Sequence, residues 1–369
     1  MSNEFILIVA WKPFREKSSG LTSDAKVTAT AKKVTVDLSK WFCGAFTRDV
    51  PCFAYNASIA DTHNMLVSTS RGLMRFDTSG QTCDKVLAEA TRWSHKWRDC
   101  YLHIKEDNLL YTSDSQGDGL VLSTPAIKCG ASDGGSGDVH LKGVHLSKNS
   151  LWLIDSNTAL LKIEMQAFAA GVASAERDVS AAVTVIQTGV LCLAFDDATG
   201  KLYYIVDESR QVRQSGRTVV QLDKKDYGKV PTAVVAGRRF LVVASQCLAK
   251  SVNILQLYSL TGRLVHEKIV SMLTESNFNS KGFMSLRLIV RCRLHFLLAV
   301  SNWNRAGLFM VSSKAIVSVV DNFAAVLDQN THSFQSVFGG EVLPGYYMDR
   351  HFEVVFVGYN TLNVVRVHW

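Results

Sequence analysis

Residues suited to recognising a partner cluster at positions 92–98, which read RWSHKWR. Tryptophan buries a large area on binding, and arginine forms paired hydrogen bonds with a carboxylate or a phosphate. The segment stands between two strand-like runs, so we expect it to connect them. Residues of similar types occupy predicted turns elsewhere, and the whole predicted contact set is Arg71, Arg92, Trp93, Lys96, Trp97, Arg98, Arg210, Trp303, Arg305 and Tyr359.

Two interpretations of this contact set are open. In the first, the side chains bind an acidic or phosphorylated segment of a larger protein. Single-stranded nucleic acid fits the same rings less well, because the basic residues do not form the continuous groove that such binding uses. In the second, Trp93 and Trp97 fill a gap between two packed layers, and the charges around them form a solvated rim.

Motifs for catalysis or metal binding are incomplete in this sequence. Residues 130–134 match the GxSxG pattern of serine hydrolases, but no helix is expected to follow them, as that strained strand-to-helix turn requires. Residues 114–119 begin like a calcium loop, yet Pro125 stands where a bidentate glutamate belongs. His140 and His145 are five positions apart, which places them on opposite faces of a strand. We therefore predict no catalytic residue, no metal site and no cofactor.

The elements that must position these residues follow a repeated pattern of β-rich runs separated by short polar turns. The pattern is clearest at 144–164, 193–214 and 346–369. A meander unit of this kind cannot bury its own faces, so successive units must stack on one another around an axis. The sequence therefore predicts an all-β fold, a single β-propeller.

Seven four-stranded blades account for the chain, with six or eight blades as alternatives. The seven blades lie at about 50–90, 99–130, 142–187, 190–223, 231–270, 283–321 and 345–369. The last blade stops after its third strand, whereas spare strands precede the first blade, within residues 3–38. One of these strands can complete the last blade, which removes a sheet edge and closes the ring. An alanine-rich stretch in the third blade, QAFAAGVASAERD, is compatible with a short helix.

Strand direction predicts where the contact set lies. Neighbouring strands of a blade alternate in direction, so the turns between second and third strands emerge on the same face as the connections between blades. With 92–98 in such a connection, the whole predicted contact set lies on one face of the disc.

Composition restricts the class of protein. The chain has 369 residues, of which 47% are apolar, and its formal net charge of +7 is dispersed in small groups, as on a solvated surface. Its eight cysteines form no CxxC pair, which favours buried thiols in a reducing compartment. No apolar window is long enough to cross a membrane, and the N-terminal apolar run lacks the flanks of a signal peptide. We expect a location in the cytoplasm or nucleus.

A metal-dependent propeller hydrolase is the enzymatic alternative. It needs several carboxylates that point into the central channel. The inner strands TAVVAG and SLRLIV offer apolar or basic side chains instead, so we do not expect an enzyme. The nearest candidate carboxylates are Asp155, Asp196, Asp197 and Glu353.

In its organisation the chain resembles the WD40-like propeller superfamily over nearly its whole length. The Trp-Asp and Gly-His pairs of that family are missing, and LAFDDATGKLYYIVD at 193–207 looks equally like a blade of lactonase-type propellers. A single seven-bladed chain of this length is similar to the mitotic-checkpoint and messenger-export adaptor propellers, which grip a segment of a larger partner. The resemblance implies a non-catalytic scaffold or adaptor in an intracellular multiprotein complex, with a nucleic-acid-associated scaffold as a further alternative.

Overall fold

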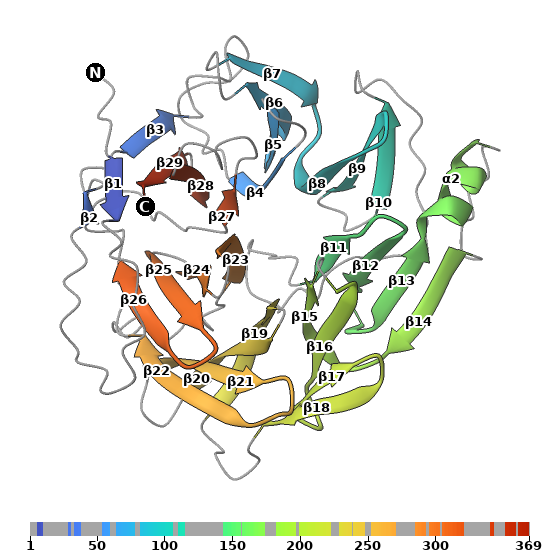
Figure 1. Cartoon of the computed structure of the whole chain (residues 1–369). Helices are drawn as coiled ribbons and strands as arrows, with labels where there is room; N and C mark the ends of the chain where they lie inside the picture. The colour runs from blue at the N-terminus through green and yellow to red at the C-terminus, as the bar shows by residue number, and fades with distance from the viewer. Residues whose placement is uncertain are drawn as a thin grey trace.

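The fold is built almost entirely of β-strands (Figure 1). A computed structural model describes residues 6–9, 29–30, 33–37, 54–59, 64–77, 82–105, 110–114, 143–155, 157–173, 182–196, 199–222, 229–237, 239–247, 252–270, 285–292, 295–302, 305–320, 340–342, 351–358 and 361–368. The strands of these segments form separate sheets, all antiparallel except for one parallel pair in the last sheet, and we number the sheets in chain order.

The first three sheets contain the N-terminal part of the predicted contact set. Sheet 1 consists of β4 (Ala54–Ile59), β5 (Asn64–Thr69), β6 (Gly72–Asp77) and β7 (Thr82–Leu87). Sheet 2 consists of β8 (Thr91–Trp97), β9 (Cys100–Lys105) and β10 (Leu110–Asp114). Sheet 3 consists of β11 (Val144–Leu146), β12 (Ser150–Ile154), β13 (Leu160–Glu164) and β14 (Val183–Gln187).

The next three sheets each have four strands. Sheet 4 consists of β15 (Val190–Asp196), β16 (Lys201–Val206), β17 (Gln211–Gln214) and β18 (Arg217–Gln221). Sheet 5 consists of β19 (Lys229–Gly237), β20 (Phe240–Cys247), β21 (Val252–Ser259) and β22 (Leu264–Val270). Sheet 6 consists of β23 (Ser285–Cys292), β24 (His295–Asn302), β25 (Arg305–Ser312) and β26 (Ile316–Val320).

Sheet 7 combines strands from the two ends of the sequence. Its C-terminal members are β27 (Gly340–Val342), β28 (His351–Gly358) and β29 (Thr361–His368), and its N-terminal members are β1 (Ile6–Val9), β2 (Ala29–Thr30) and β3 (Lys33–Asp37). Strand β29 pairs with β28 on one side. On its other side it pairs with β1 in parallel and with β3 in antiparallel orientation, so an N-terminal strand does pair with the last strand of the chain as predicted.

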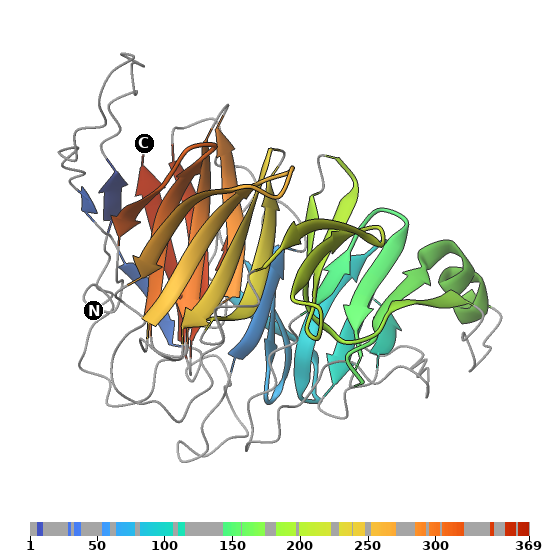
Figure 2. The same ribbon diagram turned by 90° about the horizontal axis from the view of Figure 1, so that it is seen from below.

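The first strands of the sheets lie nearest the centre of the molecule (Figure 1). Contacts join β4 to β8, β11 to β15, β15 to β19, β19 to β23 and β23 to β27, and β27 also contacts β4. Seen from below, the strands run side by side across the thickness of the molecule (Figure 2). Turns between strands therefore gather on its two faces, where side chains can meet other molecules.

The core is divided into layers. One layer lies between each pair of neighbouring sheets from sheet 1 to sheet 6. Tyr203 and Ile205 of sheet 4 pack against Leu241 and Val243 of sheet 5, all of them at most 1% exposed. A second layer joins sheets 5 and 6 through residues such as Val242 and Phe309. Strand β20 is buried on both faces, as a continuously apolar strand between two layers should be. Each such side chain contributes about 1.5–3 kcal/mol by its removal from water.

The structure corrects the prediction for residues 92–98 and confirms the predicted short helix. The segment at 92–98 does not connect two blades, because Thr91–Trp97 is strand β8, and sheet 2 therefore begins at Thr91 rather than near 99. The predicted third strand of that blade beyond Asp114 lies outside the described residues. The alanine-rich stretch does contain a helix, α2 (Met165–Ala173), which directly follows β13 and buries Phe168.

Among the described residues, no helix combines the length and the apolar character that crossing a bilayer demands.

Candidate interaction sites

Strand β8 belongs to the packed interior on the side of sheet 1. The hydroxyl group of Ser58 donates a hydrogen bond of 2.8 Å to the backbone carbonyl of Ser94. The hydroxyl groups of Ser68 and Ser94 lie 2.8 Å apart and share a second bond. These buried bonds satisfy the polar groups of Ser94, a serine in the segment RWSHKWR that the sequence analysis placed in a loop.

Trp93 is part of the core. Only 6% of the residue is exposed, and its ring packs in a cluster with Leu102 of sheet 2 and with Leu151 and Leu153 of sheet 3. Of the two interpretations given above, the described contacts of Trp93 correspond to packing between layers. A partner on the surface would have little of this ring to contact.

Trp97 and Arg98 lie at the far end of β8, where the chain turns into β9. Trp97 pairs with Cys100, and Arg98 in the intervening turn has φ of 54°. The guanidinium group of Arg98 lies 5.1 Å from the centre of the Trp97 ring, within the range of a cation–π contact. Trp97 also meets Phe168 of α2, with ring centres 6.0 Å apart. Trp97 is half-buried and Arg98 is exposed. We call this pair the Trp97–Arg98 surface.

Burial also affects the thiol beside this surface. Cys100 donates a hydrogen bond of 3.1 Å from its Sγ to the carbonyl of Trp97. Desolvation raises the pKa of the thiol above its ordinary value, the charge of Asp99 raises it further, and Arg98 opposes the change. The thiol is therefore held in its neutral form, and we assign it a structural role in the turn between β8 and β9. Cys192 and Cys247, the other described thiols with known exposure, are buried.

Apart from Trp93 and Lys96, which lie within β8, the other described members of the contact set lie at the opposite end of the strands. Arg71 stands in the turn between β5 and β6, next to Gly72, which approaches the end of β7. Three residues separate the end of β7 from β8, so half-buried Arg92 lies at this end and Arg98 at the other. The prediction that all these residues share one face is therefore wrong for Trp97 and Arg98, because a strand, and not a loop, separates them from Arg92.

Arg210 occupies the turn between β16 and β17 with φ of 47°. Its guanidinium group donates a hydrogen bond to the backbone carbonyl of Lys229, where β19 begins, so this arginine ties sheet 4 to sheet 5. Lys96 is half-buried within β8. Arg305 begins β25, while Trp303 and Tyr359 lie outside the described residues.

The carboxylates that a metal-dependent hydrolase would need have other partners where they are described. Asp155 accepts hydrogen bonds from the backbone N–H groups of Asn157 at 2.9 Å and Ala159 at 2.7 Å, and it thereby stabilises the turn before β13. Asp196 accepts a bond of 2.5 Å from the hydroxyl of Thr199 in the next turn. Asp197 lies outside the described residues, and Glu353 is in β28. The part of the chain that the structure describes contains no cluster of metal-binding side chains.

The remaining motifs give no site within the described segments. His145 stacks on Phe195 of sheet 4 with ring centres 4.5 Å apart, whereas His140 and Pro125 lie outside the described residues. Residues 130–134 also lie outside them, and of 114–119 only Asp114, the end of β10, is described.

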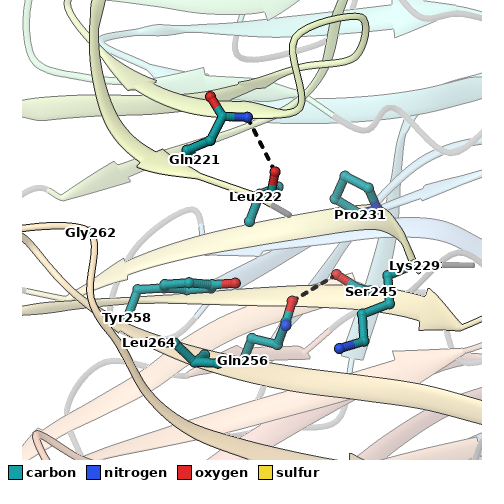
Figure 3. Close-up of a pocket in the computed structure, with 9 residues that line it drawn as sticks. All are labelled: Gln221, Leu222, Lys229, Pro231, Ser245, Gln256, Tyr258, Gly262 and Leu264. Carbon is teal, nitrogen blue, oxygen red and sulfur yellow. Dashed lines mark hydrogen bonds between the residues drawn. The ribbon is translucent and has the colours of Figure 1, made fainter. Parts of the chain in front are cut away.

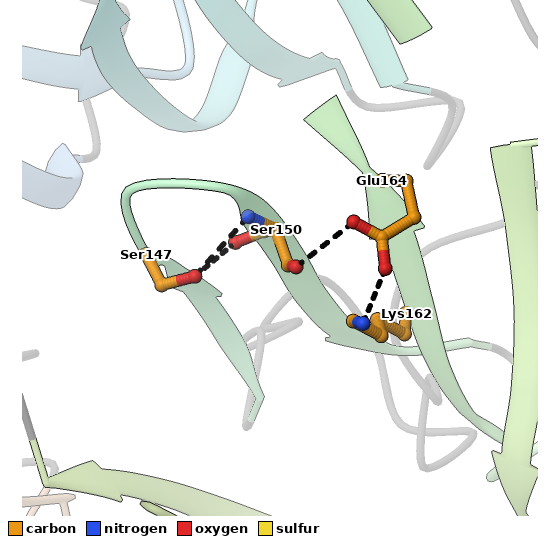
Figure 4. A network of polar contacts seen from close by, with 4 residues as sticks. All are labelled: Ser147, Ser150, Lys162 and Glu164. Atoms are coloured by element: carbon orange, nitrogen blue, oxygen red, sulfur yellow. Dashed lines mark hydrogen bonds and ion pairs between the residues drawn. The ribbon is translucent and has the colours of Figure 1, made fainter. Parts of the chain in front are cut away.

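A polar network on sheet 3 stabilises its hairpins (Figure 4). The hydroxyl of Ser147 donates to the carbonyl of Ser150 at 2.8 Å, and the hydroxyl of Ser150 donates to the carboxylate of Glu164 at 3.4 Å. Glu164 also forms an ion pair with Lys162. The hydrogen bond from Lys162 lowers the pKa of Glu164 below its ordinary value. The bonds link the four residues in a chain from Ser147 to Lys162, so we assign the network to structure.

A pocket of about 270 Å³ opens between sheets 4 and 5 (Figure 3). The edge of sheet 4 contributes Gln221 and Leu222, and all four strands of sheet 5 contribute to the opposite side. Sequence reasoning missed this pocket. The signal that was present is Gln256, a polar residue in the middle of the apolar run NILQLY, which the structure buries to 7% exposure beside the pocket.

Comparison with known proteins gives the fold. No protein-family model matches the sequence, and no curated protein matches it. One similar solved structure is a chain in an S. cerevisiae complex of a Dbp5 variant with Nup159, a Gle1 variant, IP6 and ADP. Its TM-score is 0.58 at 10% identity, covering 87% of this chain and 93% of that chain.

Two further structures agree with it. A chain of a mitotic checkpoint complex has a TM-score of 0.55 at 11% identity, covering 88% of this chain and 97% of that chain. The WD40 β-propeller domain of Doa1 has a TM-score of 0.51 at 8% identity, covering 85% and 92%. At such low identity, the likeness concerns the fold alone. The resemblance found in the sequence is thus confirmed at that level: this chain has a divergent WD40-like β-propeller fold.

Proposed function

We propose that this chain is a non-catalytic interaction scaffold, a closed seven-bladed propeller that binds a segment of a partner protein within an intracellular complex. Support for closure comes from the contact of β27 with β4 and from the pairing of β1 and β3 with β29. Support for a binding role comes from the similar folds in the checkpoint and Nup159-containing complexes, both of which are assemblies of several proteins. By analogy, the role is that of a checkpoint-type or export-type adaptor in the cytoplasm or nucleus.

The observation that carries this proposal is the Trp97–Arg98 surface. An arginine held over a tryptophan ring presents a cation and an apolar face together, which is the combination found in binding hot spots. Arg98 is exposed in a turn with positive φ, and Phe168 packs near the Trp97 ring. We propose that an acidic or phosphorylated segment of the partner pairs with Arg98.

The other end of the strands forms a second, weaker contact in this proposal. Of the remaining residues of the predicted contact set, Trp93 is buried and Lys96 is next to Trp97, and we propose the others for this second contact: Arg71, Arg92, Arg210, Trp303, Arg305 and Tyr359. Arg210 already bonds to Lys229, so its part is to hold the turn in place.

Purification of the tagged chain from its native cells, followed by mass spectrometry, tests the proposal. Arg98→Asn removes the cation while asparagine tolerates positive φ, so folding should be unaffected. Arg217→Asn is the matched control, because Arg217 is an exposed arginine at the start of β18. We expect a stoichiometric partner with the wild type and the control, and recovery reduced about tenfold with Arg98→Asn, the effect of one lost charged hydrogen bond.

Two results would count against the proposal. A chain that is recovered alone would remove the scaffold function. A partner that is equally recovered with Arg98→Asn would leave the scaffold function but remove the Trp97–Arg98 surface from it. Recovery that depends on RNA or DNA, detected by nuclease treatment, would favour the nucleic-acid-associated alternative.

A further inference from the structure

We infer that the pocket between sheets 4 and 5 binds the side-chain amide of a glutamine or asparagine in an extended segment of a partner protein. The inference rests on the proposed scaffold function, but it is independent of the Trp97–Arg98 surface. We call the pocket the amide pocket; its lining residues are Gln221, Leu222, Lys229, Pro231, Ser245, Gln256, Tyr258, Gly262 and Leu264.

The walls of the amide pocket are apolar and firmly held. Leu222 and Tyr258 are each 6% exposed and belong to the core layer between the two sheets. At one end, Gly262 in the turn between β21 and β22 lies against the carbonyl of Val219 in β18, so close that a Cβ there would overlap with it. Leu264 at the mouth is 47% exposed. Such walls suit the methylene groups of an inserted side chain.

Ser245, Gln256 and Lys229 form the polar side of the amide pocket, and a hydrogen bond joins Ser245 to Gln256 (Figure 3). The hydroxyl of Ser245, which is 2% exposed, donates to the amide oxygen of Gln256 at 3.2 Å. The amide nitrogen of Gln256 donates to Glu267 at 3.0 Å, and the same carboxylate oxygen lies 3.2 Å from the ammonium group of Lys229. These bonds fix donors and acceptors in a partly water-excluded place, where polar recognition is most selective.

The balance of charge at this side decides the class of ligand. Glu267 is not a lining residue, but it pairs with the lining residue Lys229 and neutralises it, so an inserted carboxylate would find no net positive charge and an inserted ammonium group would meet the ammonium group of Lys229. A carboxamide has no charge and offers both kinds of group. Its oxygen can accept from Lys229, and its NH₂ group can donate to the hydroxyl oxygen of Ser245. An amide is therefore the side-chain tip that this arrangement favours over either ion.

Selection of short random peptides displayed on phage against the full chain supplies a probe, whatever protein carries the natural segment. Peptides are kept if they bind the wild type and fail to bind Leu264→Arg, which blocks the mouth at an exposed position. Ile269→Arg is the matched control, since Ile269 lies on the same strand, is 57% exposed and does not line the pocket. We expect the kept peptides to share a glutamine or asparagine, and to bind the control normally.

Changes of charge in the peptide and at Glu267 then test directly whether the pocket recognises an amide. One kept peptide is made with glutamine, glutamate or lysine at the shared position, and its affinities are measured by fluorescence anisotropy. With wild type, glutamine should bind about tenfold more tightly than either ion, the typical effect of one polar contact to a charged group. Glu267→Gln leaves Lys229 without its counter-charge, so the preference should move to glutamate. A purely structural role of Glu267 would weaken all three peptides alike.

The outcomes separate this inference from the proposed function. Kept peptides with a shared acidic or basic residue, or no peptide that depends on Leu264, would overturn the amide pocket. The amide pocket would also be overturned if Glu267→Gln left the preference for glutamine over glutamate and lysine unchanged. Neither result affects the scaffold function, which depends on the recovery of a partner from native cells. Thermal melts of each variant by circular dichroism confirm that the chain is folded in every comparison.

Discussion

The contact between Gly262 and Val219 yields a sharp prediction about how sheets 4 and 5 fit together. Gly262 has φ of +85°, and a Cβ at this position would overlap with the backbone oxygen of Val219. Gly216 has nearly the same φ, +83°, but has nothing within 4 Å of the corresponding point. Substitution of each glycine by alanine therefore imposes the same backbone strain, and only one of the two disturbs the joint between the sheets.

The expected losses of stability follow from the backbone strain at each glycine and from the overlap with Val219. Left-handed φ costs an alanine about 1–2 kcal/mol, and the loss of glycine's freedom in the unfolded chain returns about 0.4–1 kcal/mol. Gly216→Ala should therefore destabilise the protein by about 1 kcal/mol. Gly262→Ala must also move a strand backbone, which is comparable to overpacking and adds about 1–3 kcal/mol. We expect a difference of about 1–3 kcal/mol between the two variants.

Urea unfolding followed by tryptophan fluorescence measures both free energies of unfolding. A second pair, Gly262→Asn and Gly216→Asn, lowers the backbone strain because asparagine tolerates positive φ, so the contribution of the overlap should persist in the difference. If the alanine variants at the two positions agree within about 0.5 kcal/mol, the order of error in such extrapolations, then sheets 4 and 5 do not meet at Val219 as described.

Three further predictions concern sheets 2 and 3. Trp93→Ala should destabilise the protein by about 3–5 kcal/mol in urea unfolding, because it empties a core layer, and a loss near zero would mean that the ring is at the surface. Alkylation of Cys100 by iodoacetamide, followed by mass spectrometry of its peptide, should require higher pH in the folded than in the unfolded chain, because burial raises the pKa of the thiol; identical pH profiles would contradict this. The pairing of Glu164 with Lys162 lowers the pKa of the carboxyl, so its stabilising effect exists above the ordinary pKa and disappears as the pH falls through the lowered value. The difference in Tm between wild type and Glu164→Gln should therefore shrink from about pH 7 to about pH 3, and a constant difference would refute the assignment.

The meander architecture was predictable because it depends on local patterns. Polar turns containing glycine, such as those ending in Gly200 and Gly262, separate runs whose length and composition suit strands, and both glycines have the positive φ that such turns favour. The helix α2 was also visible, since alanine-rich sequence has high helix propensity. The turns, the strands and the helix are thus determined by residues that are close together in the sequence.

Strand β8 and the amide pocket were not predictable in this way. Ser94 is accommodated in a buried strand only because Ser58 and Ser68 of another sheet bond to it. Likewise, Gln256 acquires a role only beside Ser245 and Glu267, which come from other strands. Periodicity in a single sequence contains no information about such distant partners, so polar residues inside strands were assigned to loops or overlooked. The same error placed Trp97 and Arg98 on the wrong face.

The composition of sheet 7 has a consequence for the synthesis of the protein. Ile6 lies opposite Arg366, so the strands that flank β29 leave the ribosome long before their partner exists. At about 5–20 residues per second, the interval is on the order of tens of seconds. During that time the edge of the apolar strand ILIV that pairs with β29 remains without its partner on the nascent chain, where it is open to intermolecular pairing. Assembly of this sheet is therefore the last step of folding, and the stage at which chaperones have most to protect.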